Sequence, residues 1–407
     1  MQKSVNVDLR VPYALAVHGD EEKKRVVAVL DEHRTNTGRE TYELEERSTK
    51  YFGKKLAVMV NSGSSANLLA FELLNLPEGS EVITPLLTFS TTVSPLLKMG
   101  LIPVFADVDP GTYVINVNQV EELITEKTKA LMIPLLLGNV PDLEKLRRIA
   151  KKYKLFFVED SCDTYGAKFA GKPTGTYTDI TTTSFFGSHI ITAAGNGGMI
   201  LVNNSKWHTR AKVLRGWGRN SSVFQESEDI TKRFKVKLGK IPYDAKFVFS
   251  EVGYNFLAPE ICAAFANAQL DKLALFKKIR VHNFSYLRKF FEKYEEFFIL
   301  PEQRKDVETQ WLAFPLTIKK DSPFSRLDIV KFLEQNNIQT RPIFTGNILK
   351  QPGFKNIPHR IADNKCPVTN EIMERGLIVG CHHGMGEQHL KKIKNVFTSF
   401  LTSITLR

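Results

Sequence analysis

Residues 181–198 read TTTSFFGSHIITAAGNGG, and the rest of the chain can be placed around this stretch. Its first six residues are β-branched, small or aromatic, which predicts a strand, and its closing glycines predict a turn before the apolar run 199–202. Ser184 and His189 therefore lie where the chain leaves a strand. Such loops hold the functional side chains of many α/β proteins, because the sheet fixes the loop and the loop exposes the side chain. Taken alone, a histidine at this place is more often a packed or surface residue.

On the N-terminal side of this stretch, short apolar runs alternate with helical segments. The runs are 56–60, 81–84, 102–105, 130–133 and 155–158. This alternation predicts a largely parallel sheet that helices cover on both faces and that extends to about residue 203. Before the sheet, residues 19–52 predict two helices with a break at 35–38. Beyond the sheet, the predicted elements are a helix from residue 259, a strand at 311–318 and a helix at 325–335.

The composition is that of an ordinary globular protein of 407 residues, with 43% hydrophobic and 25% charged residues, long enough for two domains or for a large and a small lobe. The N-terminus has no signal-peptide core, and no run approaches the roughly 20 apolar residues of a spanning helix, so we expect a cytoplasmic protein without a membrane partner. The net charge is +12, but the basic residues are interleaved with acidic ones, which argues against nucleic-acid binding. An excess of positive charge still suits the attraction of a small polyanion. The cysteines are too far apart in sequence to predict a zinc site or a disulfide framework: Cys162, Cys262, Cys366 and Cys381.

Two polar segments follow predicted strands. Residues 61–67, NSGSSAN, combine small residues and hydroxyls with the start of an apolar helix at 68–74, which suits a phosphate site or an ordinary helix N-cap. Asp160 and Asp163 follow the most apolar strand, where a carboxylate is costly unless it meets a cation or a donor. A helix N-cap would also explain Asp160, and Phe89, at another strand end, fits the core as well as a stacking role.

Five segments together resemble the DegT/StrS family of sugar aminotransferases. They are SGSSANLL (62–69), EDSCD (159–163), Ser184 with His189, GYN (253–255) and RPIFTGN (341–347). The resemblance covers nearly the whole chain and implies an aspartate-aminotransferase-like α/β fold, with a large domain at 1–276 on a mostly parallel, mixed sheet and a smaller C-terminal α/β domain at 277–407. Family aminotransferases carry a lysine five residues after the phosphate-binding serine. The 3-dehydratase branch of the family has a histidine there, as this chain does.

The resemblance also assigns roles to residues. It makes His189 the catalytic base and places Asp160 on the ring nitrogen of pyridoxal or pyridoxamine 5′-phosphate, which makes the ring an electron sink. It implies that the cofactor phosphate is bound by Gly63, Ser64, Ser65 and Ser184. It also implies that Phe89 stacks on the cofactor ring and that Asp163 lies near the ring face or its phenolic oxygen. Asn255 is expected to reach the cofactor phosphate of the neighbouring subunit, which implies a homodimer with shared active sites. Substrate contacts are expected at Arg219, Arg341 and Asn347.

The activity implied is removal of the 3-hydroxyl of a nucleotide-linked 4-keto-6-deoxy sugar, with glutamate regenerating the amine form of the cofactor. Two alternatives stay open: a dehydratase whose intermediate is reduced by a partner reductase, and an inactive protein that binds the cofactor as a regulator. Residues 220–250 hold no cysteine, so we expect no iron–sulfur cluster, and the adjacent His382 and His383 lack the spacing of a metal site. One departure from the family is Asn196, which replaces the usual glutamate in a loop, 194–198, with an apparent extra residue.

Overall fold

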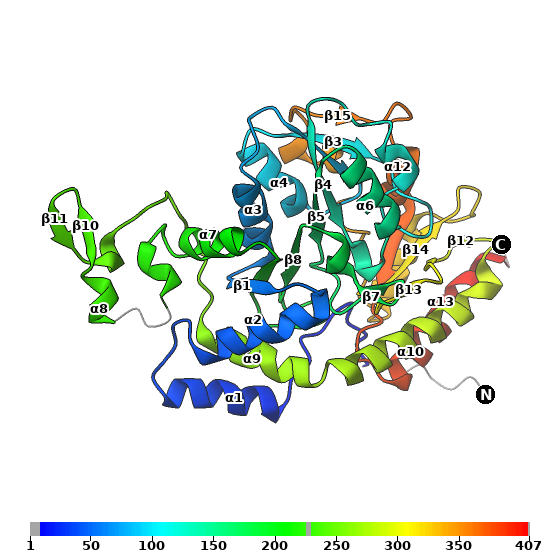
Figure 1. The fold of residues 1–407 in the computed structure, drawn as a ribbon. Helices are drawn as coiled ribbons and strands as arrows, with labels where there is room; N and C mark the ends of the chain where they lie inside the picture. Colours follow the sequence, from blue (N-terminus) through cyan, green and yellow to red (C-terminus); the bar gives the residue numbers. More distant parts are fainter. Residues whose placement is uncertain (1–8, 225–228, 406–407) are drawn as a thin grey trace.

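A computed structural model describes residues 9–224 and 229–405. Its centre is an eight-stranded sheet in the order β1-β9-β8-β5-β4-β2-β3-β15 (Figure 1). The strands are β1 (Leu56–Val60), β2 (Glu81–Pro85), β3 (Ile102–Ala106), β4 (Thr128–Pro134), β5 (Phe156–Asp160), β8 (Ile180–Ser184), β9 (Gly198–Val202) and β15 (Arg360–Ile361). Among these described strands, β9 is the one that runs antiparallel to its neighbours. The carboxyl ends of the others therefore share one edge of the sheet.

Helices cover both faces of this sheet, as the alternation of apolar runs predicts (Figure 1). In β1, Val58 and Val60 pack toward α3 and α7, whereas Ala57 and Met59 pack toward α2 and α9. Because successive strand residues face opposite sides, an uninterrupted apolar run suits a strand that is buried on both faces. The helices around the sheet are α1 (Asp20–Asp31), α2 (Arg39–Phe52), α3 (Gly63–Leu74), α4 (Ser90–Lys98), α5 (Val117–Val120), α6 (Leu143–Lys152), α7 (Ser205–Arg215) and α9 (Glu260–Asp271).

Two elements begin later or earlier than the sequence predicts. Helix α3 begins at Gly63, inside the predicted loop, because the Ser62 hydroxyl accepts a hydrogen bond from the Ser65 amide at 3.1 Å and caps the helix there. The predicted strand at 311–318 starts only at Phe314, as β14 (Phe314–Ile318), because the carbonyls of residues 311 and 312 accept hydrogen bonds from Arg280 of α10 (Leu273–Phe291).

The C-terminal part builds another hydrophobic core. A three-stranded antiparallel sheet in the order β12-β14-β16 packs against α10, α11 and α13 around Phe291, Phe314 and Phe397. These elements are α10 (Leu273–Phe291), β12 (Phe298–Ile299), β14 (Phe314–Ile318), α11 (Arg326–Gln335), α12 (Pro367–Arg375), β16 (Gly376–Val379) and α13 (Glu387–Thr405). The boundary expected at residue 276 falls inside α10.

Segments near both ends of the chain join the two parts. Val11 forms a parallel bridge with Ile338, so the N-terminal segment lies against the C-terminal part. In the other direction, the two-residue strand β15 pairs in parallel with β3 and extends the large sheet at that edge. The two parts are therefore interlinked by main-chain hydrogen bonds as well as by α10.

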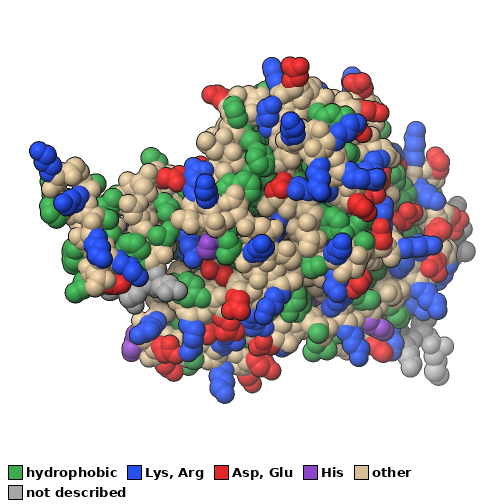
Figure 2. Space-filling view, viewed as in Figure 1, with side chains coloured by type: hydrophobic (Ala, Val, Ile, Leu, Met, Phe, Trp, Pro, Cys, Tyr) green, Lys and Arg blue, Asp and Glu red, His purple; other side chains and the backbone are tan. Residues whose placement is uncertain are grey.

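Between α7 and α9 an arm projects from the body of the molecule (Figure 1). It comprises η3 (Asn220–Val223), α8 (Ile230–Arg233), a hairpin of β10 (Val236–Leu238) and β11 (Ile241–Tyr243), and η4 (Ala245–Phe247). Figure 2 shows hydrophobic and basic side chains along this arm. Its exposed large apolar residues are Val223, Ile230, Phe234, Leu238, Ile241, Tyr243, Phe247 and Phe249.

Candidate active site

A cavity of about 560 Å³ opens at the carboxyl edge of the large sheet. Its walls come from the ends of β4, β5 and β8, from the first turn of α3 and, in the C-terminal part, from residues 341–345 and β16. Residues that follow different strands meet here because the carboxyl ends of parallel strands share one edge. The predicted site residues that line this cavity are Gly63, Ser64, Phe89, Asp160, Asp163, Ser184, His189 and Arg341.

One end of the cavity is shaped for an anion. Gly63 opens α3 without a side chain, and a Cβ added to it would lie 2.7 Å from the Cβ of Ser184. The free amides of a first helical turn, together with the helix dipole, favour negative charge at such a place. Ser64 and Ser184 line the cavity beside these amides. The predicted Ser65 does not line it, because its side chain is buried and donates to Asn61 (Oγ–Oδ1 2.7 Å).

Asp160, the last residue of β5, holds three hydrogen bonds. Its Oδ2 accepts from Asn67 Nδ2 and Thr92 Oγ1, both at 2.9 Å, and its Oδ1 accepts from the amide of Cys162 at 3.1 Å. Asn67 is held in turn by Thr182, whose Oγ1 donates to Asn67 Oδ1 at 2.6 Å. These donors orient a buried carboxylate at the cavity wall. Sequence reasoning missed Asn67, which lies in the 61–67 segment, and Thr92, which follows Phe89 closely in the sequence.

His189 and Asp163 lie together on another wall. The distance from His189 Nε2 to Asp163 Oδ1 is 3.8 Å. Burial lowers the pKa of His189 to about 4, although the negative charge of Asp160 acts to raise it. Burial also raises the pKa of Asp163 to about 7, against a hydrogen bond that its Oδ2 accepts from the Leu137 amide at 3.0 Å. The Nδ1 of His189 is buried and has no hydrogen-bond partner among the described residues. At neutral pH this imidazole is therefore uncharged and able to accept a proton.

Aromatic side chains and one arginine form the rim. Phe89 is 49% exposed and lies edge-on to Phe344, with ring centroids 6.3 Å apart, so one face of Phe89 is open to a planar ligand. The Arg341 guanidinium lies 4.9 Å from the ring centre of Tyr13, and both residues line the cavity. The sequence gives no signal for Tyr13, because tertiary contacts bring it to the site: Val11 forms a bridge with Ile338, and the Tyr13 amide donates to Gln339 Oε1 at 3.1 Å.

Three further predicted residues lie elsewhere. Arg219 and Asn255 line a second cavity, of about 1350 Å³, at the base of the arm. The described residues that line it include six lysines and arginines and no acid: Arg34, Arg39, Lys212, Arg215, Arg219 and Lys246. Asn347 is buried, caps η6 (Ile348–Lys350) and donates to the Asn370 side chain at 2.9 Å. Its side chain therefore supports the 341–347 segment, and it is not among the residues that line the first cavity.

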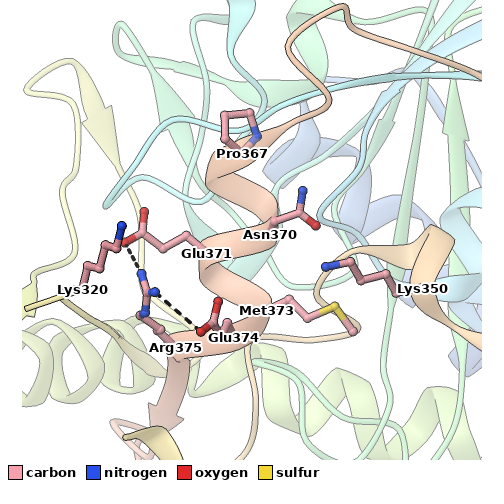
Figure 3. A pocket seen from close by; sticks show the side chains of 8 residues that line it. All are labelled: Lys320, Lys350, Pro367, Asn370, Glu371, Met373, Glu374 and Arg375. Atoms are coloured by element: carbon pink, nitrogen blue, oxygen red, sulfur yellow. Dashed lines mark hydrogen bonds and ion pairs between the residues drawn. The ribbon is translucent and has the colours of Figure 1, made fainter. Parts of the chain in front are cut away.

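A third hollow, of about 580 Å³ beside α12, holds none of the predicted residues (Figure 3). Arg375 pairs there with Glu371 at 3.1 Å and with Glu374 at 3.5 Å. The described part of the chain has no helix long and apolar enough to cross a bilayer. It also contains no group of three or more histidine, cysteine or acidic side chains that could hold a metal ion.

The first cavity fits a planar phosphate ester that carries a ring nitrogen. The glycine-lined helix N-terminus suits the phosphate, the oriented carboxylate of Asp160 suits a protonated ring nitrogen, and the open face of Phe89 suits the ring. A site of this kind at the carboxyl edge of such a sheet defines an enzyme of the aminotransferase-like, pyridoxal-phosphate-dependent class. The chain belongs to the DegT/DnrJ/EryC1/StrS aminotransferase family, whose sequence model matches residues 17–398.

Similar proteins agree with this assignment. The lipopolysaccharide biosynthesis protein RfbH of Salmonella typhimurium is 37% identical over 401 residues, which cover 96% of this chain and 91% of that protein. The dTDP-4-dehydro-2,6-dideoxy-D-glucose 3-dehydratase of Saccharopolyspora spinosa is 36% identical over 400 residues, 95% of this chain and 85% of that enzyme. A crystal structure of GDP-4-keto-6-deoxymannose-3-dehydratase with a trapped PLP–glutamate geminal diamine matches with a TM-score of 0.85 and 30% identity, covering 95% of this chain and 99% of that one. The family and fold predicted from the sequence are confirmed.

Proposed function

We propose that this chain is a pyridoxamine-phosphate-dependent 3-dehydratase of a nucleotide-linked 4-keto-6-deoxy sugar. The observation that carries the proposal is His189: it lies in the cofactor-type cavity beside Asp163, and no lysine is among the described residues that line that cavity. A lysine at this place would bond to the aldehyde form of the cofactor and favour amino transfer. The 3-dehydratase names of the relatives, and the PLP and glutamate found in one of them, support the same function.

The cavity residues would hold the cofactor at three points. Gly63, Ser64 and Ser184 would bind its phosphate, Asp160 would keep its ring nitrogen protonated, and Phe89 would stack on the ring. The bound cofactor supplies an electron sink for the carbon atoms next to its amine. Ser65 would act through the cap of α3, because its hydroxyl is bonded to Asn61.

His189 would move the protons of the reaction. Its imidazole is neutral at pH 7, so it accepts a proton as general base and can then donate that proton to the departing 3-hydroxyl. Asp163, 3.8 Å away, stabilises the imidazolium while the proton is held. Arg341, on the rim, would contact a negatively charged part of the substrate or the carboxylate of glutamate.

We also infer that two copies of the chain form a homodimer with shared active sites. Within each chain, the boundary between the large and the small domain would lie at about residue 276. The cations around Arg219 suit a nucleoside diphosphate, and a second copy seated on the arm would cover its exposed apolar residues. Mixing inactive His189→Asn and Asn255→Ala proteins tests this directly. Activity recovered in the mixture supports a site built from two chains, and no recovery after subunit exchange refutes it.

The activity itself is tested by turnover without a reductase. Purified protein with pyridoxal phosphate, glutamate and a panel of nucleotide-linked 4-keto-6-deoxy sugars should release one ammonia and one 2-oxoglutarate per sugar over many turnovers. Hydrolysis is expected to end the reaction because residues 220–250 offer no thiolates for an electron-relaying cluster. A single turnover that resumes only with a reductase and NADH would establish the reductase-coupled alternative. A cofactor spectrum unchanged by every sugar would favour an inactive regulator.

A further inference from the structure

Helix α10 carries a buried arginine that forms no ion pair with any carboxylate in the described part of the chain. Arg280 is 1% exposed. Its Nε donates to His383 Nδ1 at 3.1 Å, and its Nη1 donates to the carbonyls of Trp311 and Leu312 at 3.3 and 3.2 Å. Taking a guanidinium out of water is costly when no negative charge faces it. Burial lowers the pKa of Arg280 to about 10, so it is still charged at neutral pH.

The titratable groups packed around Arg280 do not neutralise it. Burial raises the pKa of the Cys381 thiol to about 12, so that thiol is uncharged. Burial, together with the charge of Arg280, lowers the pKa of His382 to about 4 and that of His383 to about 2, so both imidazoles are uncharged as well. His383 also stacks on Phe276, with ring centroids 3.8 Å apart, which fixes the plane of its Nδ1 acceptor. Arg280 is therefore a lone fixed charge held by neutral partners.

A run of hydrogen bonds leads from Arg280 to the active site. The peptide that links residues 311 and 312 accepts from Arg280 through its carbonyl and donates from its amide to the Leu137 carbonyl at 2.8 Å. The Leu137 amide donates to Asp163 Oδ2 at 3.0 Å, and Asp163 Oδ1 lies 3.8 Å from His189 Nε2. Leu137 has a φ of 57°, a left-handed conformation that leucine rarely adopts and that these bonds hold in place. The carbonyl and the amide of Leu137 belong to two successive peptide groups, so the two hydrogen bonds are linked through the position of the Leu137 backbone.

We propose that Arg280 is a positioning residue for the catalytic pair: through the 311–312 peptide and Leu137 it fixes Asp163 beside His189, and its charge sets the electrostatic field at the imidazole. The role of that imidazole rests on the proposed function, but the link to Arg280 does not. The sign of the effect follows from Coulomb's law, because a nearby cation disfavours the imidazolium. Loss of Arg280 should therefore raise the pKa of His189, while Asp160 and Asp163, the acids that face His189, stay in place.

Three variants separate the charge from the hydrogen bonds. Arg280→Met removes both, Arg280→Gln keeps a side-chain donor without the charge, and Arg280→Lys keeps the charge. Arg326→Met is the matched control. Arg326 also donates to two backbone carbonyls, those of Met373 and Gly376, and neither residue lines the cavity.

The direct measurement is the titration of His189 by NMR in the full-length protein, labelled with ¹³C at histidine Cε1, with His189→Asn to identify its signal. We expect the midpoint to rise by about 0.5–1 pH unit in the two neutral variants and to stay unchanged in Arg280→Lys and Arg326→Met. The acid limb of the kcat/KM profile should move by the same amount. If Arg280→Met does not fold, Arg280→Gln, which differs in charge but can still donate to a carbonyl, carries the test.

Hydrogen exchange gives a second readout. The amides of Leu137 and Leu312 should exchange about tenfold faster in Arg280→Met than in Arg326→Met, because Arg280 anchors the 311–312 peptide, which in turn holds Leu137. An unchanged His189 midpoint in both neutral variants overturns the proposal. Neither measurement needs a substrate, so this failure is distinguishable from an absence of dehydratase activity, which would leave the titration shift intact.

Discussion

Replacing Asp163 with asparagine should stabilise the cofactor-free protein, and by more as the pH rises. Burial raises the pKa of Asp163 from 3.8 to about 7, a rise of about three units. At about 1.4 kcal/mol per unit, the ionised carboxyl costs the folded state about 4 kcal/mol above pH 7. The sign follows because the folded protein binds this proton more tightly than the unfolded chain does. The associated stability is complete below about pH 4 and is lost as the pH rises to about 7.

Asparagine does not ionise, yet it keeps an oxygen that can accept the Leu137 amide. Relative to the wild type, Asp163→Asn should therefore gain about 3 kcal/mol more at pH 8 than at pH 5. The assay is thermal unfolding of both cofactor-free proteins in half-unit steps across that range. For a chain of this length the extra stability corresponds to a rise in Tm of roughly a few degrees.

Asp328→Asn provides a control, because hydrogen bonds from Ser325 lower the pKa of the Asp328 carboxyl and keep it ionised across this pH range in the folded protein as in the unfolded chain. The difference in stability between that variant and the wild type should therefore stay constant from pH 5 to pH 8. A gap between Asp163→Asn and the wild type that stays constant from pH 5 to pH 8 would refute the reasoning, since it would mean that Asp163 ionises as readily in the fold as in the unfolded chain.

Three other changes test the cofactor site. Asp160→Asn should lower the stability by about 1–3 kcal/mol, the value of one of the three hydrogen bonds to this charged group, but should lower kcat at least about 100-fold. Modest and equal losses of stability and of kcat would point to a helix-capping role. His189→Lys incubated with pyridoxal phosphate should gain an absorbance that survives dialysis and should lose dehydratase activity. If dialysis removes the chromophore, His189 does not lie beside the cofactor aldehyde. Gly63→Ala, whose Cβ would lie 2.6 Å from the Cys162 sulfur, should weaken cofactor binding by about tenfold or more in a fluorescence titration, whereas Gly353→Ala, in open space, should not.

The sequence predicts the large sheet well because most of its strands are short, uninterrupted apolar or β-branched runs, which can be recognised without reference to a partner strand. Strands β1 and β9 lie at the apolar runs that predict them, and His189 lies in the loop that follows β8, as its position after Ser184 predicts. Two-residue β15 has no such signature, since a pair of residues cannot show a period and its strand character comes entirely from β3. The same holds for Tyr13, which tertiary contacts bring to the cavity.

The same distinction between local and tertiary signals applies to the residues of the candidate site. Residues next to strand ends, such as Asp160 and Ser184, line the cavity because the sheet itself brings strand ends together. Asn347 does not, because within the RPIFTGN segment its side chain turns back to cap η6, and a linear motif does not distinguish the inward from the outward side of a loop. Arg280 lay beyond sequence reasoning altogether: one basic residue in a basic helix gives no sign that it is buried.

The position of β15 has a consequence during synthesis. Strand β3 ends at Ala106, and the strand that covers its free edge arrives about 250 residues later, at Arg360. At roughly 5–20 residues per second, a nascent chain would expose that edge for about 10–50 seconds. An open edge strand can pair with the same edge of another chain, and on a polysome such chains are close together. Ribosome stalling between these two points should therefore yield insoluble product.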